Sequence, residues 1–329
     1  FMKIQLTHTF EDIVSLENLL DAWREFVVGK KGRKDVQEFQ RNLMQNIIAL
    51  HQDLTTKTYH HLPYEAFNIS DPKPRSIHKA SVRDRLLHHA IYRKLYLFFN
   101  NTFIADSYSC RLNKGTYKAL DRFLAFAYQC SKNHTKTSWV LKGDIKKFFA
   151  SIDQDILIKI VKDYISDKNI VWLISNIVES FHSIKEKVGL PLGNLTSQLL
   201  VNIYMNKFDQ FVKHTLKVKY YIRYADDFVI LSQDKKCILS LLPKINDFLW
   251  NELRLQLHPD KVSIRTFASG IDFLGWAHFP NHRVLRTTTK HRMMKRLMYK
   301  KSEQTIQSYL GLLDHGNTHK IREQIITNQ

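Results

Sequence analysis

Cysteine, negative charge and long apolar runs are all scarce in this chain of 329 residues. Its three cysteines, Cys110, Cys130 and Cys237, are widely separated, which excludes a disulfide framework and a CxxC metal pair. Few cysteines are typical of a reducing compartment, so we expect a cytoplasmic protein. No apolar run reaches the length of a transmembrane helix, and no separate lipid-binding helix stands out. We therefore expect no membrane partner.

The shortage of acidic residues is accompanied by an excess of basic ones. The chain has 31 Asp and Glu against 50 Lys and Arg, which gives a net charge of +19 at pH 7. Such an excess is the electrostatic footprint of a polyanion partner, because neutralising phosphates releases counterions. Hydrophobic residues make up 44% of the sequence, enough for a substantial core. The composition therefore favours a basic globular protein that binds a polyanion.

Helical and strand-like segments alternate along the chain, which predicts an α+β fold around a core sheet. The apolar spacing predicts helices over residues 10–54 (with a basic interruption), 82–99, 116–128, 195–216, 238–253 and from 287 onward. Asp153 is the expected N-cap of one further helix. Runs rich in β-branched and aromatic residues predict strands at 139–141, 220–222 and 228–231, and near Leu255 and Val262.

Two adjacent carboxylates, Asp226 and Asp227, lie in Tyr224-Ala225-Asp226-Asp227 between two of these predicted strands. A hairpin tip that presents Asp side chains offers hard oxygen ligands on a rigid support, which suits Mg²⁺. An ordinary polar turn is the alternative interpretation.

A third carboxylate, Asp144, ends the predicted strand that begins at Trp139. Nucleotidyl transfer with two metal ions needs carboxylates from separate strands that converge on ions about 3.5–4 Å apart. Asp144 is a suitable partner for the acidic hairpin, although a helix cap or a solvated loop residue is the simpler interpretation of Asp144 alone. Three acidic residues at two strand ends of a basic chain favour a metal site.

Five motifs in a fixed order resemble those of reverse transcriptases. They are the strand that ends at Asp144, the loop Gly193–Gln198 (GxxxS), the YxDD box at Tyr224–Asp227, the segment Leu257-His258-Pro259-Asp260-Lys261 and the primer-grip element Phe273-Leu274-Gly275-Trp276. Together these motifs span roughly residues 70–280, which is far more specific than an isolated YxDD box.

The resemblance implies a right-hand polymerase with fingers, a palm with an antiparallel sheet and YxDD hairpin, and a short helical thumb. On this mapping, residues 1–135 form the fingers and an N-terminal palm segment. Residues 136–282 form the palm, with about 166–188 on the fingers side, and residues 283–329 form a basic helical thumb.

The resemblance also implies a metal site and a substrate. Asp144 and Asp226 would bind two Mg²⁺ ions, with Mn²⁺ as a substitute, while Asp227 would be a closer or weaker ligand and the carbonyl of Ile145 would assist. The substrates would be dNTPs. Lys261 matches a motif lysine proposed as general acid for the pyrophosphate leaving group, and a surface lysine near a turn is the alternative.

Several basic residues match positions that contact substrates in the family. Lys73 and Arg75 would hold the incoming triphosphate, unless they are a solvated pair beside a proline-rich turn. Arg111 resembles a residue that lines the template and nucleotide site, and Arg83 is a further candidate for nucleic-acid binding.

Phe149 lies five residues after Asp144, where the family has an aromatic steric gate. A ring at this position would crowd a 2′-hydroxyl and favour deoxynucleotides. Core packing by Phe148 or Phe149 is the alternative.

The middle motif departs from the common QGxxxSP pattern of the family. Leu192 precedes Gly193, and Gln198 follows Ser197. This LGxxxSQ version resembles the enzymes of diversity-generating retroelements, which copy a template RNA with errors at adenines. Replacing an amide by an aliphatic side chain beside the nascent base pair removes a hydrogen-bonding group and would loosen base selection.

The C-terminal segment is dense in cations, which favours contact with the phosphates of an RNA–DNA hybrid over a merely solvated helix face. Its candidate contact residues are Arg292, Lys295 and Arg296, and the primer-grip residues Phe273, Leu274, Gly275 and Trp276 are expected to bind the same hybrid. The resemblance further implies a structured template RNA and a small, basic, pentameric accessory protein as partners, in a prokaryotic or phage-encoded system.

Two other functions stay open at this stage. One is a different prokaryotic reverse transcriptase, of the retron, group II intron-like or phage-defence type. The other is an inactive RNA-binding protein on a polymerase scaffold, although an inactive scaffold has no metal-based reason to keep Asp144, Asp226 and Asp227.

Overall fold

The computed structural model describes residues 4–70, 74–299 and 302–327, and the chain forms two compact units. The first unit consists of Phe1–Ala105, Ile145–Phe211 and Asp247–Gln256. The second consists of Asp106–Asp144, Val212–Asn246 and Leu257–Gln329. Each unit is therefore assembled from segments that are far apart in the sequence, and each is described by itself.

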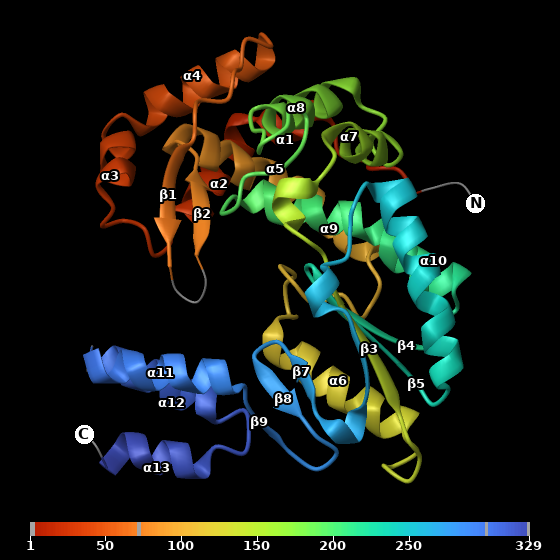
Figure 1. The fold of residues 1–329 in the computed structure, drawn as a ribbon. Helices are drawn as coiled ribbons and strands as arrows, with labels where there is room; N and C mark the ends of the chain where they lie inside the picture. The colour runs from red at the N-terminus through yellow and green to blue at the C-terminus, as the bar shows by residue number, and fades with distance from the viewer. Residues whose placement is uncertain (1–3, 71–73, 300–301, 328–329) are drawn as a thin grey trace. The chain divides into compact units, whose positions relative to one another are not determined.

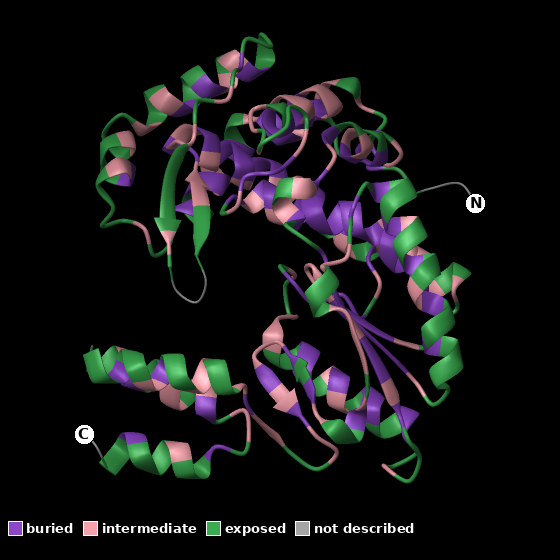
Figure 2. Ribbon diagram, viewed as in Figure 1, coloured by how far each residue is buried: buried purple, intermediate pink, exposed green. Residues whose placement is uncertain are grey.

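The first unit is mainly helical. Its helices are α1 (Phe10–Val14), α2 (Leu16–Phe26), α3 (Lys34–Arg41), α4 (Leu43–Thr55), α5 (Val82–Thr102), α7 (Gln154–Lys162), α8 (Lys168–Glu179) and α9 (Leu195–Gln210), with a short 3-10 helix, η1 (Phe148–Ser151). Helix α5 packs against both α2 and α9, and buried residues run along α5 and α9 (Figure 2). These two helices form the core of this unit because each presents apolar residues on more than one face.

One hairpin belongs to the first unit, formed by β1 (Glu65–Ile69) and β2 (Arg75–Lys79) (Figure 1). Its strands are mostly exposed. Strand β2 is attached to the loop before α9, because the His78 amide donates to the carbonyl of Leu192 at 3.0 Å and Asn194 Nδ2 donates to the carbonyl of His78 at 3.0 Å. The two segments, more than 100 residues apart, thus hold each other in place.

The second unit contains a four-stranded antiparallel sheet in the order β4-β5-β3-β6. Its strands β3, β4 and β5 are labelled in Figure 1. The strands are β3 (Trp139–Asp144), β4 (Tyr220–Tyr224), β5 (Asp227–Ser232) and β6 (Ser263–Thr266). The central strands β3 and β5 are buried along most of their length, as their continuous apolar runs predict. Helix α6 (Thr116–Cys130) packs against β4 and β5.

The C-terminal part of the second unit is a three-stranded sheet followed by three helices. They are β7 (Ile271–Phe273), β8 (Trp276–His278), β9 (Arg283–Leu285), α11 (Thr287–Tyr299), α12 (Glu303–Leu313) and α13 (His319–Thr327). Met293, Leu297, Ile306, Leu313 and Ile325 from these helices join one hydrophobic core with α6 and both sheets. The basic outer surface of these helices therefore rests on an apolar inner face.

Two predicted elements differ from the structure. The helix expected over residues 195–216 ends at Gln210 and continues as a π-helical turn, Phe211–Thr215. The strand expected near Leu255 is absent, because helix α10 (Lys235–Leu253) ends there and is followed by a left-handed residue. Arg254 has a left-handed φ of 50°, and the Leu255 amide donates to the carbonyl of Leu249 at 2.9 Å.

The remaining expectations for secondary structure are confirmed, within shifts of a few residues at element ends. The Asp153 side chain accepts a hydrogen bond from the amide of Ile156 and caps α7, as predicted. Two short 3-10 helices, η3 (Pro259–Lys261) and η4 (Phe267–Ser269), flank β6. Among the described residues, no helix combines the length and the apolar character that crossing a membrane requires.

Candidate active site

The three carboxylates singled out by sequence meet at one end of the four-stranded sheet. Asp144 is the last residue of β3, Asp227 is the first of β5, and the two are register partners. The preceding pair is Gly143 and Phe228. A Cβ atom on Gly143 would lie 2.3 Å from the Phe228 ring, so this position in β3 tolerates only glycine beside the ring.

Asp226 lies at the tip of the β4–β5 hairpin, in a two-residue connection between the paired residues Tyr224 and Asp227. Ala225, the other tip residue, has a φ of 54°, which is unusual for a residue with a Cβ atom. The guanidinium of Arg223, fully buried, donates to the carbonyl of Ala225 at 3.1 Å and to Ser107 Oγ at 3.1 Å. Arg223 therefore holds the turn in the conformation that presents Asp226.

The environment of the hairpin carboxylates opposes their ionisation. Burial, followed by the negative charges of Asp227 and Asp144, raises the pKa of Asp226 to about 6. Burial also raises the pKa of Asp227, an effect that the cation of Lys142 opposes. Like charges held together in a partly buried site are costly unless a cation is nearby.

Two lysines supply positive charge within the second unit. Lys261 Nζ, at the end of η3, donates to Asp144 Oδ1 at 2.7 Å. Lys142 Nζ lies 3.7 Å from Asp227 Oδ1, too far for a hydrogen bond. Asp227 Oδ1 is a buried atom that accepts no hydrogen bond within the part of the chain that the structure describes.

The chemistry of this group fits a hard divalent cation. It combines carboxylate oxygens from two strand ends, a raised pKa at Asp226 and a buried acceptor atom on Asp227. Within the described residues, however, no three His, Cys, Asp or Glu side chains are arranged as a complete ligand set. The residue after Asp144, Ile145, is buried. The identity of the individual ligands stays a prediction.

The predicted primer-grip element forms a tight hairpin. Phe273 and Trp276 pair across β7 and β8, and Leu274 and Gly275 occupy the turn with φ values of 49° and 88°. Positive φ at both turn positions is the arrangement that favours a two-residue hairpin. Phe273 and Trp276 are buried in the core, so their rings support the hairpin, and only the tip at Leu274 and Gly275 is accessible for direct contact with a nucleic acid.

The basic residues of the C-terminal segment fall into two groups. Arg292, Lys295 and Arg296 are exposed on one face of α11, as their spacing of three and four residues requires. Arg283 and Arg286 instead form ion pairs with acidic side chains of the same unit, Asp121 and Asp272 respectively.

Arg111, the remaining candidate in the second unit, donates from Nη1 to the carbonyl of Ser107 at 2.9 Å. Ser107 also forms a bridge with Arg223 in β4. The segment that carries Arg111 is therefore attached to the strand that leads to the acidic hairpin.

The predicted nucleotide-binding residues of the first unit are partly accessible. Arg75 is exposed at the start of β2, and Lys73 lies outside the described residues. Phe148 is buried, whereas Phe149 is only partly buried and contacts Phe148 edge-to-face. Of the two rings, Phe148 therefore belongs to the core, and Phe149 is the one available for contact with a ligand.

Leu192 and Gln198 are both partly accessible, and Gly193 between them is exposed. Gly193 has a φ of 110°, and a Cβ atom there would lie 2.9 Å from Ile77 of β2. The glycine thus allows the loop to adopt its conformation and to approach the β1–β2 hairpin closely. The backbone N–H of Gln198 donates to the carbonyl of Asn194 in the first turn of α9.

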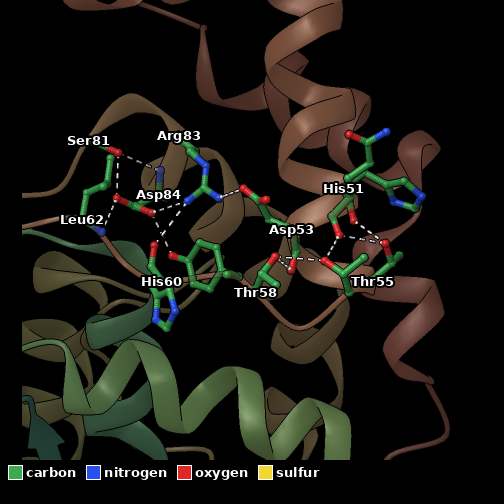
Figure 3. A network of polar contacts seen from close by, with 12 residues as sticks. His51, Asp53, Thr55, Thr58, His60, Leu62, Ser81, Arg83 and Asp84 are labelled. Atoms are coloured by element: carbon green, nitrogen blue, oxygen red, sulfur yellow. Dashed lines mark hydrogen bonds and ion pairs between the residues drawn. The ribbon is translucent and has the colours of Figure 1, made fainter.

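Arg83 lies in a polar network of the first unit (Figure 3). Its Nη2 donates to Asp53 Oδ2 at 2.6 Å, and its guanidinium lies 4.8 Å from the centre of the Tyr59 ring. The structure thus gives Arg83 several intramolecular partners, and its predicted contact with nucleic acid stays a prediction.

Sequence reasoning missed three residues that support the carboxylates. Arg223 holds the hairpin turn, Lys142 faces Asp227, and the His258 amide donates to the carbonyl of Asp144 at 2.7 Å. An arginine inside the otherwise apolar strand β4 was the available signal for Arg223. Lys142 acts from a neighbouring strand and His258 acts through its backbone amide, and a single sequence gives no signal for either.

Comparisons with known proteins agree with this geometry. Residues 70–278, well over half of the chain, match the family model of reverse transcriptase (RNA-dependent DNA polymerase). The chain is 25% identical over 297 residues to protein YkfC of Escherichia coli, covering 78% of this chain and 75% of YkfC. It is 23% identical over 302 residues to the group II intron-encoded protein LtrA of Lactococcus lactis, covering 70% of this chain and 49% of LtrA.

A solved structure supports the fold. The chain is similar to apo telomerase from Candida tropicalis with a TM-score of 0.53 and 14% identity, covering 74% of this chain and 60% of that one. The predicted right-hand polymerase fold is therefore confirmed, and the predicted enzyme class, an RNA-directed DNA polymerase, is confirmed at the level of the family. The chain belongs to the reverse transcriptase family.

Proposed function

We propose that this protein synthesises DNA on the RNA template of a retroelement, by nucleotidyl transfer at the carboxylates of β3 and the β4–β5 hairpin. The observation that carries the proposal is the register pairing of Asp144 with Asp227. This pairing brings the two strand ends and Asp226 together at one end of the sheet. This is the arrangement of carboxylates that two-metal chemistry requires.

In the proposed mechanism, Asp144 and Asp226 would hold two Mg²⁺ ions, Asp227 would be a closer or weaker ligand, and the carbonyl of Ile145 would assist. When bound, these ions would lower the pKa of the primer 3′-hydroxyl and neutralise the charge that develops on the leaving pyrophosphate. Arg223 keeps the hairpin tip rigid, so the carboxylate of Asp226 needs little reorganisation during the reaction. The charge repulsion among the carboxylates favours the binding of cations at this end of the sheet.

Lys261 has two roles in this proposal. Its ammonium neutralises Asp144 before the metal ions bind. On release from Asp144, Nζ donates a proton to the pyrophosphate, which is the role that the resemblance to the family implies.

The substrate side of the proposal rests on the first unit and on family resemblance. Arg75 contacts the triphosphate and Phe149 excludes the 2′-hydroxyl, so dNTPs are the preferred substrates. The partial exposure of Phe149, in contrast to the buried Phe148, supports this assignment. Phe149→Ala is expected to raise ribonucleotide incorporation, and unchanged sugar discrimination would remove Phe149 from this role.

The test of the function is Mg²⁺-dependent incorporation of dNTPs on a primed RNA template. The wild-type protein is expected to extend the primer, and Asp226→Asn is expected to abolish extension while the protein stays folded. Absence of extension by the wild-type protein would favour an RNA-binding protein without polymerase activity. Equal extension by both would show that the measured activity does not come from the carboxylates of this protein, and would favour the same conclusion.

The finer proposal is that the enzyme belongs to a diversity-generating retroelement and copies template adenines with errors. The LGxxxSQ motif supports it, because Leu192 replaces a side chain that can form hydrogen bonds by one that cannot, and Leu192 is partly accessible. Leu192→Gln is then expected to lower misincorporation opposite adenine more than opposite the other bases. Template fidelity at adenine equal to that at other bases in the wild-type protein would exclude this branch. A small, basic, pentameric accessory protein and a structured template RNA are the partners that this branch implies.

The second candidate is a group II intron-like reverse transcriptase, which the similarity to LtrA favours. The chain spans only 49% of LtrA, so the activities of the whole relative do not transfer directly. The RNA that copurifies with the protein distinguishes the two candidates, because an intron RNA and a retroelement template RNA differ in sequence.

A further inference from the structure

A basic cavity lies in the second unit at the end of the sheet opposite to the carboxylates. It has a volume of about 360 Å³ and is bounded by the end of α6, the loop before β4 and the start of α10. Its lining includes Lys132, Lys217, Lys219, Tyr220, Gln233 and Cys237. The lining contains three lysines and no acidic residue.

The register of the sheet locates this cavity relative to the carboxylates. Tyr220 begins β4 and pairs with Leu231 near the end of β5, whereas Asp227 begins β5. The six residues of β5 separate the two ends of the sheet by roughly 15–20 Å. A ligand in the cavity would therefore be distant from the carboxylates of Asp144 and Asp226.

The surroundings of the cavity add to its positive charge. The three segments around it, residues 132–136, 213–219 and 234–236, contain seven lysines and one aspartate. That aspartate, Asp234, accepts a hydrogen bond from the Lys236 amide at the start of α10, so it serves the helix terminus. Such a concentration of one sign of charge attracts an anionic ligand.

The loop that presents the lysines is held in a defined conformation. Lys213 Nζ donates to the carbonyls of Val218 and Lys219, each at 3.0 Å, and the Val218 amide donates to the carbonyl of Val212. Lys217 has a left-handed φ of 54°. The π-helical turn Phe211–Thr215 leads into this loop, and such turns are frequent at functional sites. Two of the three lining lysines, Lys217 and Lys219, are thus carried by a preorganised loop.

We propose that this basic cavity binds the phosphate backbone of RNA outside the primer–template duplex. Lysine ammonium groups are point charges that suit phosphate oxygens. Lys219 Nζ lies 5.2 Å from the centre of the Tyr220 ring, which packs against the core, so this ammonium is positioned at the wall of the cavity. The ligand is RNA because the family copies RNA, and a template continues beyond the duplex that occupies a polymerase. The inference rests on the proposed function only in the class of its ligand.

The experiment compares two RNA templates that share one primer duplex. One is blunt, and the other carries single-stranded extensions of about 20 nucleotides at both ends. The wild-type protein is expected to bind the extended RNA about tenfold more tightly. In a triple variant, Lys132→Gln, Lys217→Gln and Lys219→Gln, this advantage is expected to disappear, and the slope of log K against log salt is expected to fall by about 2.

The matched control neutralises three exposed lysines of the first unit, Lys159→Gln, Lys162→Gln and Lys168→Gln. The control is expected to keep the tenfold advantage. Both triple variants are expected to extend, at the wild-type rate, a primer on a template whose single-stranded overhang is too short to reach the cavity. Persistence of the advantage in the cavity variant, or its equal loss in the control, would overturn the proposal.

A second measurement uses Cys237 and does not depend on the folding of a triple variant. Cys237 lines the cavity and is exposed, Cys110 is also exposed, and Cys130 is buried. In a Cys110→Ser background, the extended RNA is expected to slow maleimide labelling of Cys237 more than the blunt RNA does. Equal protection by both RNAs, or equal protection by polyglutamate, would contradict an RNA site and in the second case indicate an acidic protein partner.

The two measurements also separate this inference from the proposed function. If the wild-type protein fails to extend a primer but shows the lysine-dependent advantage, the polymerase proposal fails and the cavity assignment stands. If the wild-type protein extends a primer but binds the extended RNA no more tightly than the blunt RNA, the cavity assignment fails and the polymerase proposal stands.

Discussion

Each unit of this protein contains aspartate withdrawn from solvent, fully buried in the first unit and partly buried in the second, and the two cases differ in how the charge is compensated. Asp84 in the first unit is fully buried and accepts hydrogen bonds from Tyr59 Oη at 2.8 Å, Ser81 Oγ at 2.7 Å and the Leu62 amide at 3.2 Å (Figure 3). Arg83 Nη1 lies 3.5 Å from Asp84 Oδ1. This carboxylate has the partners that a buried charge needs.

The acidic hairpin of the second unit is compensated less completely. Asp226 and Asp227 are adjacent, the pKa of each is raised, and Asp227 Oδ1 is buried without a hydrogen bond among the described residues. A buried polar group left unsatisfied costs about 1–3 kcal/mol, so its presence calls for an explanation. The comparison teaches that Asp84 stabilises the fold, whereas the incomplete compensation of Asp226 and Asp227 supports the proposal that they bind a cation.

The largest effect is expected from Asp226→Asn. Loss of one charged metal ligand is expected to reduce primer extension by at least about 10³-fold, equivalent to about 4 kcal/mol. Because the substitution removes a like charge from a partly buried cluster, the melting temperature is expected to stay equal or to rise. Steady-state extension and thermal unfolding of the same samples measure both.

The control for this variant is Asp260→Asn, which changes an exposed carboxylate next to Lys261. Its extension rate is expected to stay within about twofold of the wild type. A clear loss of stability in Asp226→Asn would contradict the distinction between the two kinds of aspartate.

The opposite result is expected at Asp84. Asp84→Asn leaves an amide among groups that donate hydrogen bonds, so the free energy of unfolding is expected to fall by about 3 kcal/mol. Extension per folded molecule is expected to be unchanged at low temperature. Asp53→Asn is the matched control, since Asp53 pairs with the same Arg83 but is 43% exposed, and its cost is expected to be below about 1 kcal/mol. Equal costs at Asp53 and Asp84 would refute the role given to burial here.

The backbone of the site could be predicted from the sequence. Uninterrupted apolar runs define β3 and β5, and the acidic residues mark the ends where those runs stop. The two-residue connection follows from the short distance between Ile222 and Phe228 in the sequence. Local patterns suffice because strands and tight turns are local structures.

The compensation of charge could not be predicted in this way. Lys261 and Asp144 are 117 residues apart, and Arg223 bonds to Ser107 across 116 residues. Such pairs depend on tertiary packing, as does the burial of Phe273 and Trp276, which sequence alone had assigned to nucleic-acid contact. The end of α10 at Leu255 is a similar case, because a single left-handed residue, Arg254, decides it.

An intermediate effect is expected at Lys261, where compensation and catalysis overlap. Lys261→Met is expected to lower the extension rate by about 10²-fold if Nζ is the general acid. Lys261→Arg separates the two roles, because a guanidinium retains the ion pair with Asp144 but does not release a proton near neutral pH. Relative to Lys261→Met, we expect Lys261→Arg to recover the stability of the wild-type protein but not its extension rate. Full rescue of the rate by arginine would leave Lys261 with the neutralisation of Asp144 alone.

The smallest effect, and the one that distinguishes the two sites most directly, is the response of stability to Mg²⁺. A cation that binds only the folded protein stabilises it by about 1.4 kcal/mol when its concentration is ten times the dissociation constant. We expect the melting temperature of the wild-type protein to rise with Mg²⁺ at constant ionic strength. The same rise is expected in Asp84→Asn, although its starting temperature is lower, because the ligands of the second unit are intact. In Asp226→Asn the rise is expected to be lost, since the remaining carboxylates bind the cation more weakly. A rise that survives in Asp226→Asn and disappears in Asp84→Asn would reverse the roles assigned to Asp84 and Asp226.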